Sequence, residues 1–197
     1  MRCLSMRFVV TTFAATSLLI AGCGDDDDID FDVGQTGPAG GVIFFADDGG
    51  DYDFNYLEAA PKDAESEGDN STIHLWASGY GDAFFIQAND SAIGSGEENT
   101  ATIVAGLEDD EQSGRAAQVA ADFEVGGYDD WFLPSRDELE LMYEELHLQE
   151  LGDFQDSNYW SSTEVGLERA MGQNFHSGLQ TEWRKDFTYY VRPIRAF

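Results

Sequence analysis

Two carboxylates, a tryptophan and an arginine lie close together in the segment 128–138, where they could bind a sugar. Asp129 and Asp130 directly precede Trp131, and Arg136 follows a Pro-Ser pair. Carboxylates accept hydrogen bonds from sugar hydroxyls, and an indole ring offers an apolar face for stacking. The segment therefore predicts a ligand-binding loop. A Trp131 buried in the core and an Arg136 paired with a neighbouring acid would explain the same residues.

A second group of polar residues follows in the last third of the chain. Trp160, Ser162 and Glu164 lie within the segment 159–164, and Asn174 lies ten residues further on. Hydroxyl, carboxylate and amide oxygens are the groups that coordinate Ca²⁺ or contact sugar hydroxyls. The same alternation is typical of a strand with one hydrated face. Both interpretations, a ligand site and a structural strand, stay open at this stage.

Four aspartates near the first strand are candidates for a weak calcium site. They are Asp47, Asp48, Asp51 and Asp53. The run 51–55 opens like a calcium-binding loop, but an EF-hand requires glycine at the sixth position and glutamate at the twelfth. Tyr56 and Lys62 occupy those positions. The sequence therefore predicts no EF-hand, and calcium is kept only as a candidate cofactor of the aspartates.

No catalytic motif stands out in the chain. It contains no G-x-S-x-G, no H-E-x-x-H and no phosphate-binding loop. The two cysteines, Cys3 and Cys23, both lie at the front of the chain, so a thiol nucleophile is not expected in the folded part. With 39 acidic residues, pairs of carboxylates occur throughout and single out no glycosidase site. We expect no enzyme, and a surface polysaccharide hydrolase is the alternative.

The first residues predict an exported lipoprotein. Arg2 and Arg7 are followed by an apolar stretch over residues 8–20, which is the layout of a secretory signal. The stretch is short for a membrane span, which needs about 20 residues. The segment 19–23, LIAGC, resembles the lipobox of bacterial lipoproteins, in which the cysteine receives a diacylglyceryl group before cleavage. We therefore expect a signal peptide over residues 1–22 and lipidation at Cys23, which attaches the protein to the membrane.

An acidic tether is predicted over residues 23–36. Four aspartates in a row, beginning at Asp25, cannot pack in a core and should remain solvated. Lipoproteins that carry aspartate directly after the cysteine are often retained at the inner membrane, but Gly24 occupies that position here. The sequence therefore predicts a location in the cell envelope, with the outer membrane favoured.

The mature chain is extremely acidic. Removing Arg2 and Arg7 with the signal leaves eight basic residues against 39 acidic ones, a formal charge of −31. Such a charge repels phosphate backbones, so nucleic acid is not expected as a partner. The basic residues Arg192 and Arg195, near the end of the chain, are expected to form structural ion pairs. The charge is compatible with a neutral glycan, a protein or a cation as ligand.

The remaining pattern predicts strands, then helices, then strands. Short apolar runs at 41–46, 56–60 and 73–76 are typical of strands. Helical periodicity begins at Asn99 or Thr100, and again over 113–123 and 135–147. Ser135 and Glu138 have the spacing of a capping box. Strands follow at 159–163, 170–175 and 188–197. This order predicts an α+β domain in which strand 41–46 lies beside strand 189–194.

Several blocks of the chain, in one order, resemble the Lcl C-terminal domain family, named for a collagen-like bacterial adhesin. They are TGPAGGVIFF (36–45), LEAAP (57–61), IGSGEENTATIVA (93–105), GGYDDWFLPSRDELELMYEEL (126–146), YWSSTE (159–164) and YYVRPIRAF (189–197). The resemblance implies a domain over residues 37–197 with a compact C-type-lectin-like fold, short antiparallel sheets, two to three helices and adjacent terminal strands.

The resemblance also implies a role in adhesion. The family occurs on secreted, surface-attached proteins, and its adhesin binds sulfated polysaccharide through a basic surface. The strongly negative charge of the present chain departs from that pattern. We therefore expect an envelope-anchored, non-catalytic binding domain for a neutral glycan or an envelope protein. A structural envelope lipoprotein with a protein partner is a further alternative.

Overall fold

The computed structural model describes residues 30–66, 71–78 and 86–197 of the chain. The predicted signal peptide, Cys23 and most of the predicted tether lie outside the described residues. Residues Phe31–Phe197 form one compact unit. This unit begins before the predicted boundary at residue 37, because the ring of Phe31 packs edge-on against the rings of Tyr56 and Phe197, with centroids 5.4 and 5.9 Å away.

Three strands from the two ends of this unit form one antiparallel sheet. They are β1 (Val42–Ala46), β2 (Tyr56–Ala59) and β8 (Ile194–Ala196), in the order β1-β2-β8. The C-terminal strand pairs with β2, with Leu57 opposite Ala196 and Ala59 opposite Ile194. The C-terminal strand therefore shares a sheet with β1, but β2 lies between them. The sequence had predicted that the two strands lie directly side by side. The short connection over residues 47–55 explains the observed order, since it folds β2 back onto β1 first.

The other strands form a five-stranded sheet. They are β3 (Ile73–Leu75), β4 (Asn158–Glu164), β5 (Arg169–Asn174), β6 (Gln180–Arg184) and β7 (Thr188–Tyr190), in the order β3-β7-β4-β5-β6. The single closing strand predicted over 188–197 is therefore wrong, because β7 and β8 belong to different sheets. Pro193 lies in the break; it has no amide hydrogen for a ladder and is disfavoured within a central strand.

Between β3 and β4, the described residues form three α-helices and a short 3-10 helix. They are α1 (Gly96–Asp109), α2 (Ala116–Ala121), α3 (Arg136–Glu145) and η1 (His147–Gln149). The capping box predicted at Ser135 is confirmed, because the Ser135 side chain accepts from the Glu138 amide. The α2 helix is shorter than the predicted segment 113–123.

The predicted start of α1 at residue 99 or 100 is wrong by about one turn. The N-cap is Ser95, and Asn99 and Thr100 are buried inside the helix. Their side chains do not cap it but bind neighbouring segments. The Asn99 amide donates to the carbonyl of Asp90 at 2.7 Å, and the Thr100 hydroxyl donates to that of Leu133 at 3.2 Å.

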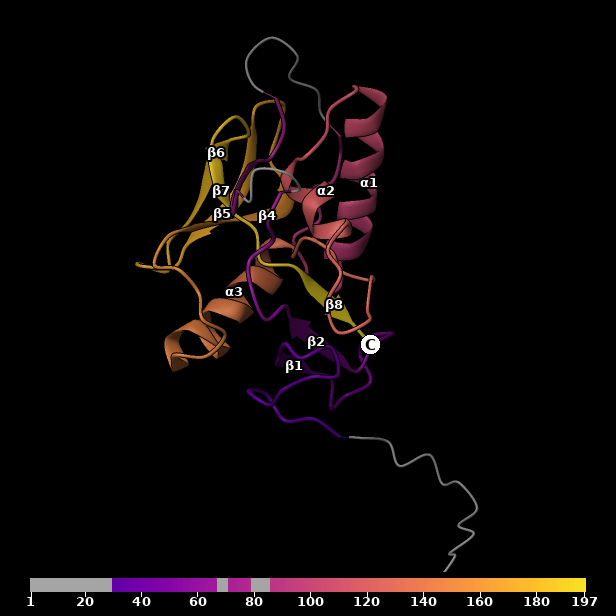
Figure 1. Cartoon of the computed structure of the whole chain (residues 1–197), viewed down its shortest axis with the longest axis vertical. Helices are drawn as coiled ribbons and strands as arrows, with labels where there is room; N and C mark the ends of the chain where they lie inside the picture. The colour runs from indigo at the N-terminus through magenta and orange to yellow at the C-terminus, as the bar shows by residue number, and fades with distance from the viewer. Residues whose placement is uncertain (1–29, 67–70, 79–85) are drawn as a thin grey trace, which may run out of the picture. The chain divides into compact units, whose positions relative to one another are not determined.

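Two clusters of buried apolar residues make up the core. In Figure 1, α1 and α2 lie on one side of the five-stranded sheet, and α3 contacts strands of both sheets. The cluster beneath α1 and α2 contains Trp76, Trp131 and Trp160. The cluster beneath α3 contains Phe44 and Tyr159. The α+β class predicted from the sequence is confirmed.

Candidate functional site

The tryptophans proposed for stacking a ligand lie in the core. Trp131 is 3% exposed, packs edge-on against Phe123 with ring centroids 5.6 Å apart, and donates its indole N–H to the Tyr128 carbonyl at 3.1 Å. Trp160 is fully buried and donates to the carbonyl of His74 at 2.9 Å. Neither ring faces the surface in this structure, so the structure offers no indole face at these positions for a sugar to stack on.

Asp130 is exposed, but its carboxylate is paired with the buried Arg195. Arg195 donates to both Asp130 carboxylate oxygens, Nε to Oδ1 at 2.8 Å and Nη2 to Oδ2 at 2.7 Å. Its Nη1 lies 3.3 Å from the carboxylate of the fully buried Glu58. The Arg195 guanidinium also lies over the rings of Tyr128 and Phe197, at 4.0 and 4.7 Å from their centroids. The hydrogen bonds from Arg195 lower the pKa of Asp130.

The structural ion pairs predicted for the two C-terminal arginines are both confirmed. Besides the Arg195 network, the buried Arg192 lies 2.8 Å from Asp63 through its Nε atom. The Arg192 guanidinium also lies over the ring of Phe154, 4.2 Å from its centroid. Both arginine side chains therefore form ion pairs with acids of the same domain.

Ser162 and Glu164, on β4, are buried. The Ser162 hydroxyl accepts a hydrogen bond from the Asn99 side chain at 3.3 Å. The Glu164 carboxylate accepts from the backbone amides of Ile86 and Gln87, at 3.0 and 2.7 Å, and forms a buried ion pair with Lys185. Both oxygens of Glu164 are therefore occupied by groups of the protein itself.

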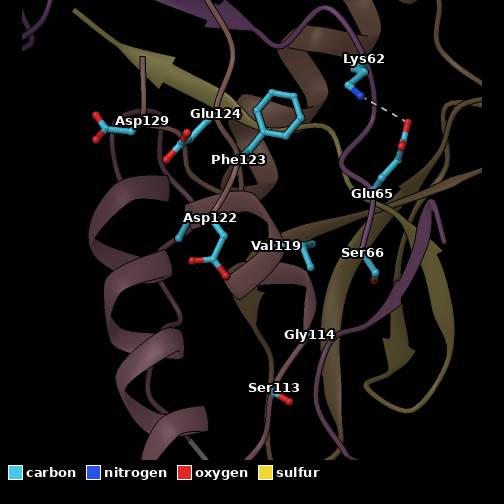
Figure 2. A pocket seen from close by; sticks show the side chains of 11 residues that line it. Lys62, Glu65, Ser66, Ser113, Gly114, Val119, Asp122, Phe123, Glu124 and Asp129 are labelled. Atoms are coloured by element: carbon cyan, nitrogen blue, oxygen red, sulfur yellow. Dashed lines mark hydrogen bonds and ion pairs between the residues drawn. The ribbon is translucent and has the colours of Figure 1, made fainter. Parts of the chain in front are cut away.

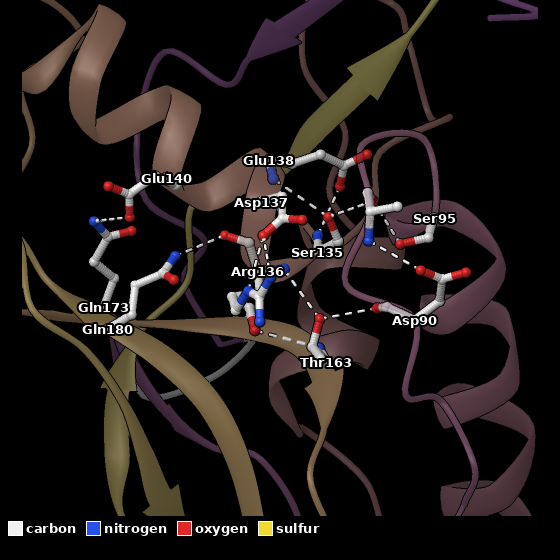
Figure 3. A network of polar contacts seen from close by, with 12 residues as sticks. Asp90, Ser95, Ser135, Arg136, Asp137, Glu138, Glu140, Thr163, Gln173 and Gln180 are labelled. Atoms are coloured by element: carbon white, nitrogen blue, oxygen red, sulfur yellow. Dashed lines mark hydrogen bonds and ion pairs between the residues drawn. The ribbon is translucent and has the colours of Figure 1, made fainter.

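Arg136 and Asn174 also bind their own neighbours. Arg136 pairs with Asp137, with Nη2 and Oδ1 2.7 Å apart, and its backbone amide donates to the Thr163 hydroxyl at 3.0 Å (Figure 3). The Asn174 side chain donates to Asn158 at 2.7 Å, and its oxygen accepts from the backbone amide of Ser177 at 2.9 Å. These contacts stabilise the start of α3 and the turn after β5.

The aspartates proposed for calcium do not converge on one point. Within residues 30–66, 71–78 and 86–197, no three His, Cys, Asp or Glu side chains are arranged to hold a metal ion. The Asp47 carboxylate instead accepts from the backbone amides of Gly49, Gly50 and Tyr52, at 2.9–3.2 Å. Asp47 thus orders the turn between β1 and β2, while Asp48, Asp51 and Asp53 are exposed.

Asp129, one of the predicted ligand residues, lines a surface cavity. It borders a hollow of about 970 Å³ between the segment before β3 and the segment around α2. Its lining consists of Lys62, Glu65, Ser66, Ser113, Gly114, Val119, Ala121, Asp122, Phe123, Glu124 and Asp129. Figure 2 shows the Lys62–Glu65 ion pair on one side of this hollow and the carboxylates of Asp122, Glu124 and Asp129 on the other. We call it the Asp122 hollow.

A buried carboxylate, that of Glu138, joins the starts of α1 and α3. Glu138 is fully buried and accepts from the backbone amides of Ser135 at 2.6 Å and Gly94 at 2.8 Å. Ser135 caps α3, and Gly94 lies directly before Ser95, the N-cap of α1 (Figure 3). One carboxylate thus lies at the positive ends of two helices. Burial nevertheless raises the pKa of Glu138 to about 7, against the lowering effect of these amide donors.

Comparison of the sequence with known protein families identifies one matching family. The sequence profile described as the Lcl C-terminal domain matches residues 67–195, which include α1, α2, α3 and all five strands of the five-stranded sheet. The chain belongs to the Lcl C-terminal domain family. A search of curated proteins found no match.

The Asp122 hollow of this Lcl C-terminal domain was only partly predictable. Asp129 lies in a block that resembles the family, but Asp122 and Glu124 lie at and just beyond the end of α2, where the sequence shows only the apolar periodicity of a helix. Lys62 and Glu65 come from a connection far away in sequence. No local pattern joins these segments; the tertiary fold alone brings them together.

Over the described residues of the domain, no helix is long and apolar enough to span a membrane.

Proposed function

We propose that this chain is an envelope-anchored lipoprotein, favoured at the outer membrane, whose Lcl C-terminal domain binds a neutral glycan without transforming it. The observation that carries the binding part is the Asp122 hollow. Its volume, about 970 Å³, lies near the upper end of the range of about 300–1,000 Å³ for ligand sites. A short oligosaccharide fits a hollow of this size.

The chemistry of the Asp122 hollow supports a hydroxyl-rich ligand. The carboxylates of Asp122, Glu124 and Asp129 accept hydrogen bonds, and the hydroxyls of Ser66 and Ser113 both donate and accept them. These carboxylates would repel sulfate or phosphate groups. The ligand expected here therefore differs in charge from the sulfated polysaccharide implied by the family resemblance.

Binding and hydrolysis by the Asp122 hollow are distinguished by the products. Its lining contains carboxylates, which are also the groups that glycosidases use, and the proposal is that the bound glycan is left intact. Release of new reducing ends from a bound glycan would contradict this part of the proposal and favour the hydrolase alternative.

Replacing Asp122 and Glu124 together by alanine is expected to weaken glycan binding at least about tenfold, because each carboxylate bonded to a hydroxyl contributes more than about 1 kcal/mol. An array of neutral oligosaccharides, read with and without Ca²⁺, would select the ligand, and calorimetry would measure its affinity. The full chain carrying Cys23→Ser is a suitable protein, since it lacks the lipid acceptor.

The matched control is Glu168→Ala with Glu182→Ala, two exposed acids of which the first directly precedes β5 and the second lies on β6. This pair removes the same charge at a distance from the Asp122 hollow and should leave the affinity unchanged. An equal loss in both double variants, or an array without any bound glycan, would exclude the hollow as the site.

The anchor is tested separately. In the native host, Cys23 is expected to carry acyl chains and to form the N-terminus, because the lipobox-like segment LIAGC precedes it. Mass spectrometry of the purified protein measures both features, and Cys23→Ser should move the protein from the membrane to the soluble fraction. An unmodified Cys23 in a cytosolic chain would refute the lipoprotein assignment.

A further inference from the structure

A second hollow with a different character lies along α1. It has a volume of about 450 Å³ and shares only Ala121 and Asp129 with the Asp122 hollow. The lining consists of Glu97, Thr100, Ala101, Val104, Ala105, Glu108, Ala121, Asp129, Asp130, Trp131 and Phe132. We call it the α1 groove. Its middle is apolar, and its lining contains no lysine or arginine.

The spacing along α1 explains why the α1 groove is apolar in the middle and acidic at both ends. Positions 97, 101, 104, 105 and 108 follow the i, i+4, i+7, i+8, i+11 repeat of one helix face. Ala101, Val104 and Ala105 form the centre of this stripe, and Ala101 and Ala105 are exposed. Glu97 and Glu108 lie at its ends, about 16 Å apart along the helix axis.

The wall opposite α1 adds further negative charge. Asp129 is exposed there, whereas Asp130 is already paired with Arg195. Glu97, Glu108 and Asp129 therefore surround the apolar centre from different sides. Carboxylates in this arrangement favour an occupant that brings cations to the edge of the groove and apolar side chains to its centre.

The charge of the chain excludes two obvious occupants. The segment 24–28 of the same chain, Gly followed by four aspartates, carries the same sign as the groove. A second copy of the mature chain would bring another formal −31. Both would be repelled. The occupant is therefore another molecule, with the opposite charge and an apolar face.

We propose that the α1 groove binds a cationic amphipathic segment of another protein. Its apolar side chains cover Ala101, Val104 and Ala105, and its lysines or arginines pair with Glu97 and Glu108. The distance between these glutamates corresponds to cations about three helical turns apart in a helical partner. This site goes beyond the glycan site, because Glu97 and Glu108 do not line the Asp122 hollow.

The probe is a fluorescein-labelled synthetic helix of repeating Lys-Leu-Leu-Lys units, about four turns long. Its binding to the full chain carrying Cys23→Ser is measured by fluorescence anisotropy. Glu108→Lys is expected to weaken binding at least about tenfold, because it replaces an attractive charge at the end of the groove by a repulsive one. Val104→Lys, at the centre, should weaken binding by at least as much.

The matched control is Asp109→Lys. It changes the net charge by the same amount, one residue away in the last turn of α1, at an exposed position that does not line the groove. A change of less than about twofold in this variant, beside the loss in Glu108→Lys, supports the groove. Equal losses in both variants would show attraction to the overall charge only and would overturn the proposal.

A second peptide distinguishes binding in the α1 groove from attraction by charge alone. A peptide of the same composition in scrambled order keeps the cations but has no apolar face, so it should bind at least about tenfold more weakly. Equal binding of both peptides, or no binding of the ordered one, would overturn the proposal. Neither result bears on the glycan site, which is tested with Asp122 and Glu124.

Discussion

Replacing Arg195 by methionine is expected to lower the free energy of unfolding by about 3–5 kcal/mol, as for a broken buried ion pair. Glu58 is fully buried, and besides Arg195 it accepts from the backbone amides of Ala39 and Gly41. Without the guanidinium, its charge would lie in the core next to amide donors alone. Urea denaturation, followed by circular dichroism, measures the loss.

The control for this prediction is Asp130→Asn, which removes the other acid that pairs with Arg195. The Asp130 side chain is 48% exposed, so its ion pair should contribute less than about 1 kcal/mol. Arg195 would keep Glu58 in this variant. A loss in Asp130→Asn as large as that in Arg195→Met would show that the stabilisation comes from the surface pair and not from Glu58.

The Arg195 network shows which features of the fold can be predicted from sequence. A scarce cation near the end of a very acidic chain predicts an ion pair, and this prediction is confirmed. Its buried partner could not be predicted, because Glu58 lies 137 residues away and on a neighbouring strand. Local patterns give the elements; the pairing of distant elements depends on the whole chain.

The helices illustrate the same limit. The capping box of Ser135 and Glu138 is a local pattern and was predicted correctly. The second role of Glu138, at the start of α1, depends on a contact with Gly94 across 44 residues. That contact explains why α1 begins earlier than its apolar periodicity suggests. Gly96 is the first residue of α1, and a Cβ atom there would lie 2.3 Å from the Glu138 carboxylate, which leaves room for glycine only.

The candidate ligand residues also show that residue type can be read from the sequence but burial cannot. Glu164 has the residue type of a calcium or sugar ligand, but in the structure it pairs with Lys185 in the core. Sequence type alone does not distinguish these roles, because a buried carboxylate and a ligand carboxylate use the same atoms. Exposure distinguishes them: Asp129 is exposed and borders both hollows, whereas Glu164 is buried.

Glu138→Gln is expected to destabilise the domain by at least about 2 kcal/mol near pH 5, because the amide nitrogen of glutamine would face a buried N–H donor. Ser135 and Gly94 donate to different oxygens of the Glu138 carboxyl group. Both oxygens can accept even when the group is protonated, whereas glutamine offers only one acceptor oxygen. The measurement is the free energy of unfolding in urea at a series of pH values. Glu145→Gln, exposed on the same helix, should change neither the stability nor its pH dependence appreciably.

The pH dependence of this loss has a definite sign. Burial raises the pKa of Glu138 from 4.5 to about 7, so between these values the native state holds a proton that the unfolded state has released. The stability that this proton contributes is present at pH 5 and is lost as the pH rises through about 7. Glutamine does not titrate, so the difference between wild type and Glu138→Gln should shrink between pH 5 and pH 8. A difference that stays constant over this range would show that the amide donors of α1 and α3 keep Glu138 ionised, despite its burial.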